Sequence, residues 1–156
     1  MVKPIPDGYH SVTPYLVIDG AAEALEFYKK ALGAQELFRM PMGDKIGHAE
    51  IKIGDSHVML SDEWAPMNLL SPAKRGGTTV SLMVYVDDVD AAYKRAIDAG
   101  ASQERAPENQ FYGDRSGSLL DPFGHRWTLA THVEDVPMDE LQRRMDEFAE
   151  AQPEPA

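Results

Sequence analysis

Cysteine is absent from the 156 residues, so no disulfide, thiolate metal site or cysteine nucleophile is available. Basic side chains are also few, because 15 Lys and Arg stand against 26 Asp and Glu, for a formal net charge of −11. Such a surface repels phosphate, and neither nucleic acid nor an anionic membrane is an expected partner. The chain lacks both an apolar run long enough to span a bilayer and an apolar signal region in MVKPIPDGYH. These absences predict a cytoplasmic protein.

Several catalytic motifs are missing as well. The sequence has no HExxH, no GxSxG and no phosphate-binding glycine loop, so nucleophilic catalysis has no support from motifs. What the chain does have is 43% apolar residues, enough to bury a core, and a length suited to one domain or to two small modules that share a core.

The chain repeats itself. Val12–Asp19 (VTPYLVID) and Val80–Asp87 (VSLMVYVD) are short, apolar and β-rich, and both end in Asp. Apolar residues at helical spacing follow each segment, with Asp19 and either Asp87 or Asp88 as candidate N-caps. A Gly-Ala pair then ends each helix, at Gly33 and at Gly100. The same order of strand, Asp, helix and Gly-Ala indicates a duplication.

Strand patterns follow each helix, so each module is predicted to be β-α-β-β-β. The expected strands after the helices are 36–40, 48–53 and 57–60 in the first module and 102–105, 115–120 and 126–132 in the second. The predicted organisation of the single 1–156 domain is a first module at 9–62, a linker at 63–79, a second module at 80–133, and an acidic C-terminal helix and tail at 134–156.

A turn at Gly54-Asp55 fixes which side chains share a face of the first sheet. With a two-residue loop, Ile53 pairs with Ser56 and the register runs back from there. Side chains alternate between faces, so one face is wholly apolar and is expected under the helices. It holds Ala49, Ile51, Ile53, Val58 and Leu60. The opposite face holds His48, Glu50, Lys52, His57, Met59 and Ser61, and it lines either solvent or a wet cavity.

The segment Pro137–Glu150 predicts an amphipathic helix with a narrow apolar stripe of Leu141, Met145, Phe148 and Ala149. Pro137 suits the first helical turn and Asp135 a cap. The stripe requires a partner surface, which is either the back of the same domain or a second protomer.

Two such modules, with the stretches below, resemble the vicinal oxygen chelate superfamily, which includes glyoxalase I, extradiol dioxygenases, fosfomycin-resistance enzymes and bleomycin-resistance proteins. Six stretches carry the resemblance, which covers roughly residues 9–135, and they look like its PhnB-like, glyoxalase/bleomycin-resistance branch. They are Thr13–Val17, Phe27-Tyr28, His48–Ile51, Val58–Asp62, Tyr112–Gly117 and Asp121–Trp127. The resemblance implies an α+β fold in which two βαβββ modules form a curved mixed sheet around a cavity, commonly as a homodimer.

The metal enzymes of this superfamily carry their ligands on the first and last strands of each module. Carried over, those positions are Thr13, Met59, Ser81 and Thr128 here. Hydroxyls and a thioether do not hold a divalent ion as imidazole and carboxylate do, so no metal and no cofactor is expected.

His48 and Glu50 remain as candidates for chemistry, because residues two apart on a strand point to the same face. The pair is consistent with a general base and the carboxylate that orients it, with a metal site that includes His57, or simply with a polar sheet face.

Arg115, in a loop after Phe111, Tyr112 and Gly113, is expected either to bind an anionic group of a ligand or to pair with Asp114. Tyr15 and Tyr85 are expected on the inner face, and Trp127 in the core. The candidate ligand-binding residues are Thr13, Tyr15, His48, Glu50, Met59, Ser61, Ser81, Tyr85, Tyr112, Arg115 and Thr128.

Two functional classes follow from these residues and from the resemblance, besides a scaffold dimer with a collapsed cavity. The first is a metal-free protein that binds a cationic or aromatic small molecule, as bleomycin-resistance proteins do. The second is a glyoxalase-like lyase or isomerase with a non-standard site at His48 and Glu50.

Overall fold

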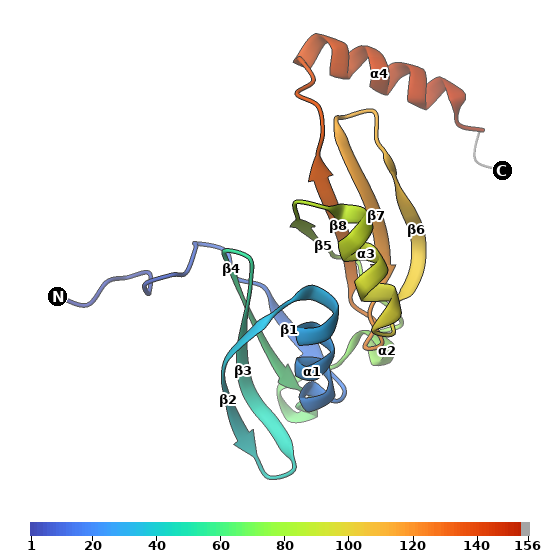
Figure 1. Ribbon diagram of the computed structural model, residues 1–156. Helices are drawn as coiled ribbons and strands as arrows, with labels where there is room; N and C mark the ends of the chain where they lie inside the picture. Colours follow the sequence, from blue (N-terminus) through green and yellow to red (C-terminus); the bar gives the residue numbers. More distant parts are fainter. Residues whose placement is uncertain (154–156) are drawn as a thin grey trace.

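The computed structural model describes residues 1–153, and its first module is a strand, a helix and three further strands (Figure 1). These are β1 (Tyr15–Ile18), α1 (Ala21–Leu32), β2 (Gln35–Met42), β3 (Lys45–Ile53) and β4 (Ser56–Asp62). The order in the sheet is β1-β4-β3-β2, with β1 parallel to β4 and the other pairs antiparallel.

The second module repeats this arrangement. It consists of β5 (Ser81–Tyr85), α3 (Val89–Asp98), β6 (Ser102–Asn109), β7 (Asp114–Leu120) and β8 (Arg126–His132). Its sheet has the order β5-β8-β7-β6, and β5 is again parallel to its neighbour. The α+β fold with two βαβββ modules is therefore confirmed.

The register predicted for the β3–β4 hairpin is also confirmed. Ile53 pairs with Ser56 and Glu50 pairs with Met59 across the Gly54-Asp55 turn. The predicted apolar face is buried beneath α1, with Ile51 fully inaccessible. Because the turn fixes the register, it also fixes the face on which each polar side chain of this hairpin lies.

Of three helix ends predicted from the sequence, two are confirmed and one is wrong. Asp88 caps α3 by accepting a hydrogen bond from the Ala91 amide (3.0 Å), and Gly33 ends α1 in the left-handed conformation (φ 63°). The cap predicted at Asp19 is wrong, because Gly20 is the N-cap of α1. There the carboxylate of Asp62, at the end of β4, accepts from the amides of Gly20 (3.1 Å) and Ala21 (2.9 Å). A distant acceptor thus does what a local cap does elsewhere.

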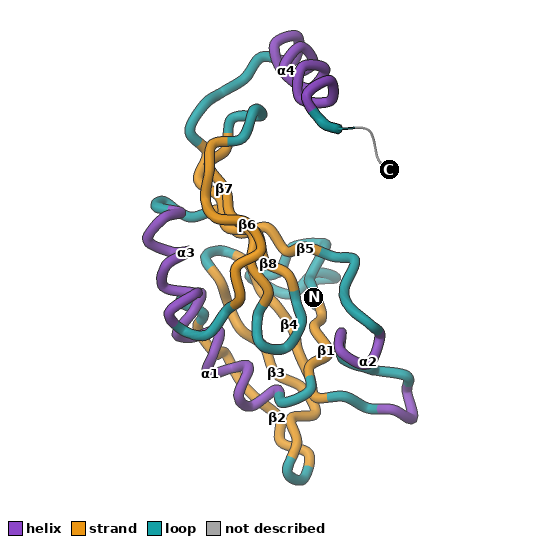
Figure 2. The backbone as a smooth tube through the Cα atoms, turned by 90° about the vertical axis from the view of Figure 1, so that its right-hand side faces the viewer, coloured by secondary structure: helices purple, strands orange, loops and turns teal. Residues whose placement is uncertain are grey.

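The two modules join through their helices and through one buried carboxylate. Helices α1 and α3 pack against each other, and Figure 2 shows both on the same side of the strands. Asp121, in the turn before β8, accepts from the Tyr28 hydroxyl of α1 (2.6 Å) and from the Trp127 indole (2.9 Å). Trp127 is buried, as predicted for a core residue. The core is one continuous cluster across both modules.

The segments outside the modules take three forms. The expected linker contains two short helical turns, η1 (Ala65–Met67) and α2 (Pro72–Arg75). The predicted C-terminal helix is α4 (Met138–Ala151), which stands beyond the end of the second sheet (Figure 1). Asp135 does not cap it, since the N-cap is Pro137 and Asp135 bonds to His132 instead. Residues 154–156 of the predicted tail lie outside the described residues.

The free surface of α4 is larger than its contact with its own chain. Phe148 packs on Phe111 at the β6–β7 turn (ring centroids 5.2 Å apart), and Arg144 donates to the Phe111 carbonyl (3.1 Å). Phe148 and Met145 stay nearly half exposed. The described contacts of the helix are thus with the β6–β7 turn of its own domain, which is neither of the two surfaces expected for it.

Candidate site on the open sheet faces

Each sheet has one face covered by helices and one face that no helix of its own module covers, here called the open face. In the first module the pairing places Phe38 opposite Glu50 and Met40 opposite His48, so these four side chains share the open face with Met59. In the second module the exposed side chains of Ser81, Met83 and Tyr85 mark the corresponding face of β5. Most of the predicted ligand-binding residues lie on these two faces.

A hydrogen-bonded chain of three side chains lies on the first open face. Glu50 Oε1 is 3.1 Å from His48 Nε2, and His48 Nδ1 is 3.0 Å from the Tyr15 hydroxyl. With an ionised Glu50 and a neutral imidazole, Nε2 carries the proton and Nδ1 accepts from Tyr15. Phe38 lies beside the imidazole, with ring centroids 5.8 Å apart. The predicted pair of His48 and Glu50 is thus in contact, and Tyr15 joins it from β1.

Glu50 is the buried member of this chain. Glu50 is 5% exposed, and its Oε2 atom has no hydrogen-bond partner among residues 1–153. The sole ion pair that the described residues give it is with His48. A buried carboxylate oxygen without a donor is costly, so this atom marks a place where the site is chemically incomplete.

The second open face carries a comparable network at its far end. The carboxylate of Asp114, at the start of β7, accepts from the Tyr85 hydroxyl (2.8 Å) and from His132 Nδ1 (2.8 Å). The hydrogen bond to Asp114 raises the pKa of Tyr85, and the carboxylates of Asp135 and Asp114 raise the pKa of His132. Both oxygens of Asp114 have hydrogen-bond partners, whereas only one oxygen of Glu50 has a described partner.

The positions to which the resemblance assigns metal ligands do not fit a metal ion. Ser81 and Thr128 bond to each other (2.8 Å), and Thr128 also bonds to Ser118 (3.1 Å). Thr13 and Met59 add a hydroxyl and a thioether, neither of which replaces imidazole or carboxylate. Within residues 1–153 no three His, Asp or Glu side chains gather as metal ligands, so the alternative site of His48, Glu50 and His57 does not form.

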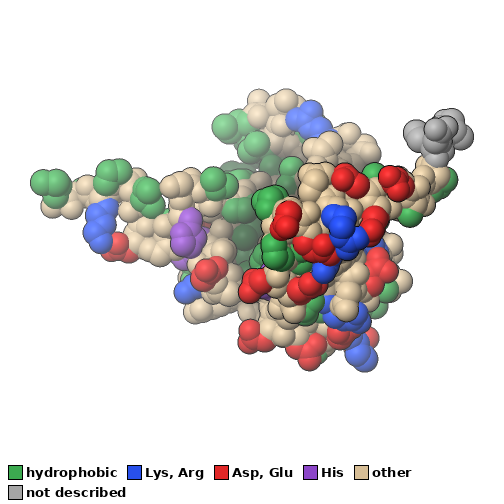
Figure 3. All heavy atoms as spheres, turned by 90° about the horizontal axis from the view of Figure 1, so that it is seen from above, with side chains coloured by type: hydrophobic (Ala, Val, Ile, Leu, Met, Phe, Trp, Pro, Cys, Tyr) green, Lys and Arg blue, Asp and Glu red, His purple; other side chains and the backbone are tan. Residues whose placement is uncertain are grey.

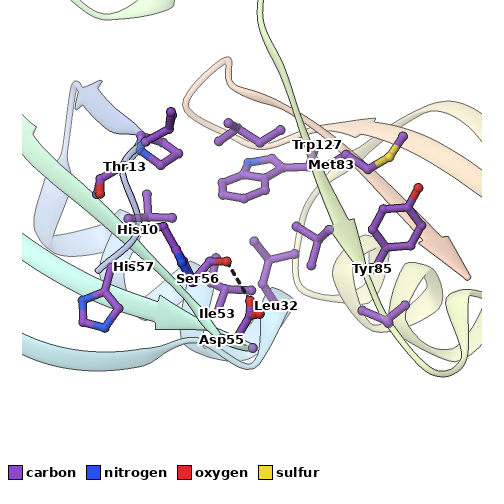
Figure 4. A pocket seen from close by; sticks show the side chains of 17 residues that line it. His10, Thr13, Leu32, Ile53, Asp55, Ser56, His57, Met83, Tyr85 and Trp127 are labelled. Carbon is purple, nitrogen blue, oxygen red and sulfur yellow. Dashed lines mark hydrogen bonds between the residues drawn. The ribbon is translucent and has the colours of Figure 1, made fainter. Parts of the chain in front are cut away.

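A cavity of about 620 Å³ lies between the modules (Figure 4). Its walls come from the N-terminal segment, the tip of the β3–β4 hairpin and β5. Ile53, Leu82 and Trp127 give it apolar surface, and Thr13 and Tyr85 are among its polar lining residues. A cavity with apolar walls and a few polar groups is the usual form of a small-molecule site.

Two predicted ligand-binding residues, Arg115 and Tyr112, lie elsewhere, and a third, Ser61, is not exposed on the open face. Arg115 extends toward the helix side, where it pairs with Asp90 of α3 through Nε (2.8 Å) and Nη2 (2.9 Å), and not with Asp114. Tyr112 lies in the β6–β7 turn against Phe111. Ser61 is buried and donates to the carbonyl of Asp62 (3.0 Å).

Phe38, Asp114 and His132 are members of the open faces that were not predicted from the sequence. Phe38 had a usable signal, since it stands two residues from Met40 in a predicted strand. Asp114 and His132 had none, because their pairing depends on the register of β7 with β8.

No helix of residues 1–153 is both long enough and apolar enough to cross a membrane.

Comparison with known proteins places these features in a family. The sequence profile described as Glyoxalase/Bleomycin resistance protein/Dioxygenase superfamily matches residues 9–129. Uncharacterized protein Rv0887c of Mycobacterium tuberculosis (strain ATCC 25618 / H37Rv) is 45% identical over 139 residues, which cover 86% of this chain and 82% of that protein.

Two solved structures illustrate the similarity of fold. The crystal structure of TioX from Micromonospora sp. ML1 is 26% identical with a TM-score of 0.65, and the match covers 80% of this chain and 99% of that one. Fosfomycin resistance protein FosX from Mesorhizobium loti is 16% identical with a TM-score of 0.59, covering 84% and 95%. At that identity the second match concerns the fold alone.

Proposed function

The chain belongs to the glyoxalase/bleomycin resistance protein/dioxygenase superfamily, and on that premise we propose that it binds a small cationic or aromatic organic molecule without a resident metal ion. The observation that carries the proposal is the pairing of buried carboxylates with exposed aromatic rings on the open faces. Glu50 lies opposite Phe38 and is linked to Tyr15 through His48, and Asp114 bonds to Tyr85. None of the described Lys or Arg side chains pairs with either carboxylate.

Charge and ring chemistry together favour a cationic aromatic ligand. A carboxylate in a partly desolvated site attracts a cation more strongly than it does in water. Exposed tyrosine and phenylalanine rings offer stacking and cation–π contacts to a flat cation. The net charge of −11 steers such a ligand toward the protein and repels anions.

A second copy of this chain completes the ligand site in this proposal. Strands β1 and β5 each have one neighbour in their sheets, so each leaves one edge unpaired. The open faces beside these edges expose Tyr15, Phe38 and Met40 in one module and Met83 and Tyr85 in the other. A homodimer would cover these strand edges and aromatic rings. Light scattering is then expected to give a mass twice the 17.3 kDa of the chain.

The binding proposal is tested with three planar compounds of different charge: berberine as the cation, phenazine as the neutral compound and anthraquinone-2-sulfonate as the anion. Titration calorimetry is expected to give the tightest binding for berberine. Tyr15→Ala is expected to weaken it about tenfold, the equivalent of ~1.4 kcal/mol, through lost ring contact. Trp64→Ala, which removes an exposed ring from the linker, is the matched control.

Two results overturn the proposal. The first is equal or tighter binding of the sulfonate, which contradicts the charge argument. The second is loss of berberine binding on treatment with EDTA, which reveals dependence on a metal ion.

The chain of Tyr15, His48 and Glu50 favours one second candidate, an enzyme that moves a proton next to a carbonyl group. Glu50 orients the imidazole, and Nδ1 of the imidazole accepts a hydrogen bond from the Tyr15 hydroxyl, an arrangement suited to general acid–base catalysis. Incubating a bound carbonyl compound in D2O distinguishes the two functions. Recovery of the unreacted compound favours binding alone. Deuterium incorporation that His48→Ala abolishes, with binding intact, favours the enzyme.

A further inference from the structure

The N-terminal segment, residues 1–14, forms a second pocket over the open face of the first module. Its first residues project from the body of the molecule (Figure 3), whereas Tyr9 stacks on His57 of β4, with ring centroids 4.1 Å apart. A pocket of about 380 Å³ lies between this segment and the sheet. Glu50 and Met59 line it from the sheet, and Pro4, Ile5, Pro6, Tyr9, His10, Ser11 and Thr13 line it from the segment.

This pocket contains one buried carboxylate, and its other walls combine apolar groups with the polar side chains of the N-terminal segment. Oε1 of Glu50 is occupied by His48, and Oε2 is buried without a donor among the described residues. Prolines, Ile5 and Met59 supply the apolar surface. A single carboxylate is too few ligands for a metal ion. An N–H donor that also carries positive charge satisfies the free oxygen best.

We infer that this pocket is the subsite for the protonated amino group of the ligand, a primary or secondary organic amine whose apolar body lies against Met59 and the proline-rich segment. The inference rests on the proposed binding function and adds the chemical class of the group that Glu50 holds. A quaternary ammonium has the charge but no N–H to donate, and an alcohol has the donor but no charge. Both should therefore bind more weakly than the amine.

The test compares benzylamine, benzyl alcohol and benzyltrimethylammonium by titration of ¹⁵N-labelled protein at neutral pH. Benzylamine is expected to shift the amide resonances of Glu50 and of Tyr9 at millimolar concentration. Its affinity is expected to exceed that of the other two compounds by about tenfold or more. Glu50→Gln keeps the shape of the side chain but removes its charge, and it should reduce the affinity for benzylamine to that for benzyl alcohol.

Asp44→Asn is the matched control, because Asp44 is an exposed carboxylate in the β2–β3 turn and its loss changes the net charge equally. Tyr9→Ser tests the segment itself and should weaken benzylamine binding without changing the spectrum of the sheet. The spectrum of each variant establishes that it is folded.

The outcomes separate this inference from the function on which it rests. If berberine still binds but benzylamine is unaffected by Glu50→Gln, the subsite is wrong and the binding function stands. If benzylamine does not bind, or if ¹³C titration of Glu50 shows a protonated carboxyl at neutral pH with and without the amine, the subsite is likewise overturned. If neither berberine nor benzylamine binds, both proposals fail.

Discussion

Asp121 provides the sharpest test of how the two modules are held together. All four described partners of its carboxylate donate hydrogen bonds to it. Oδ2 accepts from Tyr28 and Trp127, and Oδ1 accepts from the amides of Phe123 (2.9 Å) and His125 (2.9 Å). Asp121→Asn keeps the size of the side chain but turns one of these two acceptors into an NH2 group. Whichever way the amide is oriented, two donors then face another donor.

The expected effect follows from the burial of these groups. Tyr28 and Trp127 are 0% and 1% exposed, so water cannot replace the lost acceptor. An unsatisfied buried donor costs about 1–3 kcal/mol, and Asp121→Asn should lower the free energy of unfolding by roughly 2–4 kcal/mol. That is a large part of the about 5–15 kcal/mol typical of a domain. Tm should fall by about 2–4 °C for each kcal/mol.

Urea unfolding followed by tryptophan fluorescence measures this loss. Asp87→Asn removes an exposed carboxylate that has no described partner, and it should leave the unfolding free energy within about 0.5 kcal/mol of the parent. Tyr28→Phe removes one donor and leaves Trp127 on Oδ2, so it should cost about 1 kcal/mol. A cost for Asp121→Asn no larger than that of Asp87→Asn would refute the role of Asp121 as the buried junction.

Two further predictions concern the first sheet and the linker. Ile51→Asp places an unpaired charge in the core and should abolish folding. Glu50→Ala changes the other face of the same strand and should leave the circular dichroism spectrum and Tm nearly unchanged. A folded Ile51→Asp variant would contradict the assigned faces. Hydrogen bonds from Lys74 and Ser71 hold the pKa of Glu63 at about 2, below its ordinary 4.5, so its stabilisation is present above about pH 4.5 and is lost as the pH falls toward 2. Glu63→Gln should therefore flatten the unfolding free energy over that window, and parallel curves for the two proteins would argue against the effect.

The sequence predicted those parts of the fold that depend on local signals. The Gly54-Asp55 turn determined the β3–β4 register, and the register determined that His48 and Glu50 share a face. Asp88 and Gly33 mark helix ends by chemistry that acts within a few residues. In each case the interaction that decides the structure is close in sequence to the residues that it positions.

Most of the failures are long-range, although Asp135, which bonds to nearby His132 instead of capping α4, is a local one. Asp62 caps α1 from 41 residues away, so the local candidate Asp19 was chosen instead. Arg115 was assigned to Asp114 or to a ligand, yet its partner is Asp90 of α3, 25 positions away. The turn at Asp121 was recognised as a motif, but its contact with Tyr28 joins residues that are 93 positions apart. No local pattern encodes such contacts.

The buried carboxylates of this protein also separate structural roles from a functional one. Asp121 and Asp114 have hydrogen bonds to both oxygens, and Glu63 is matched by Lys74 and the Ser71 amide. Glu50 differs, since it alone among these four keeps a buried oxygen with no described donor.

A fold that needed Glu50 only for stability would gain from replacing it with an apolar residue, because a half-satisfied buried charge is worse than none. The presence of Glu50 is therefore explained by a hydrogen-bond donor that a bound ligand supplies to Oε2. Glu50→Ala is therefore expected to weaken ligand binding while it preserves or raises the stability of the fold, a combination that replacing a structural carboxylate such as Asp121 cannot produce.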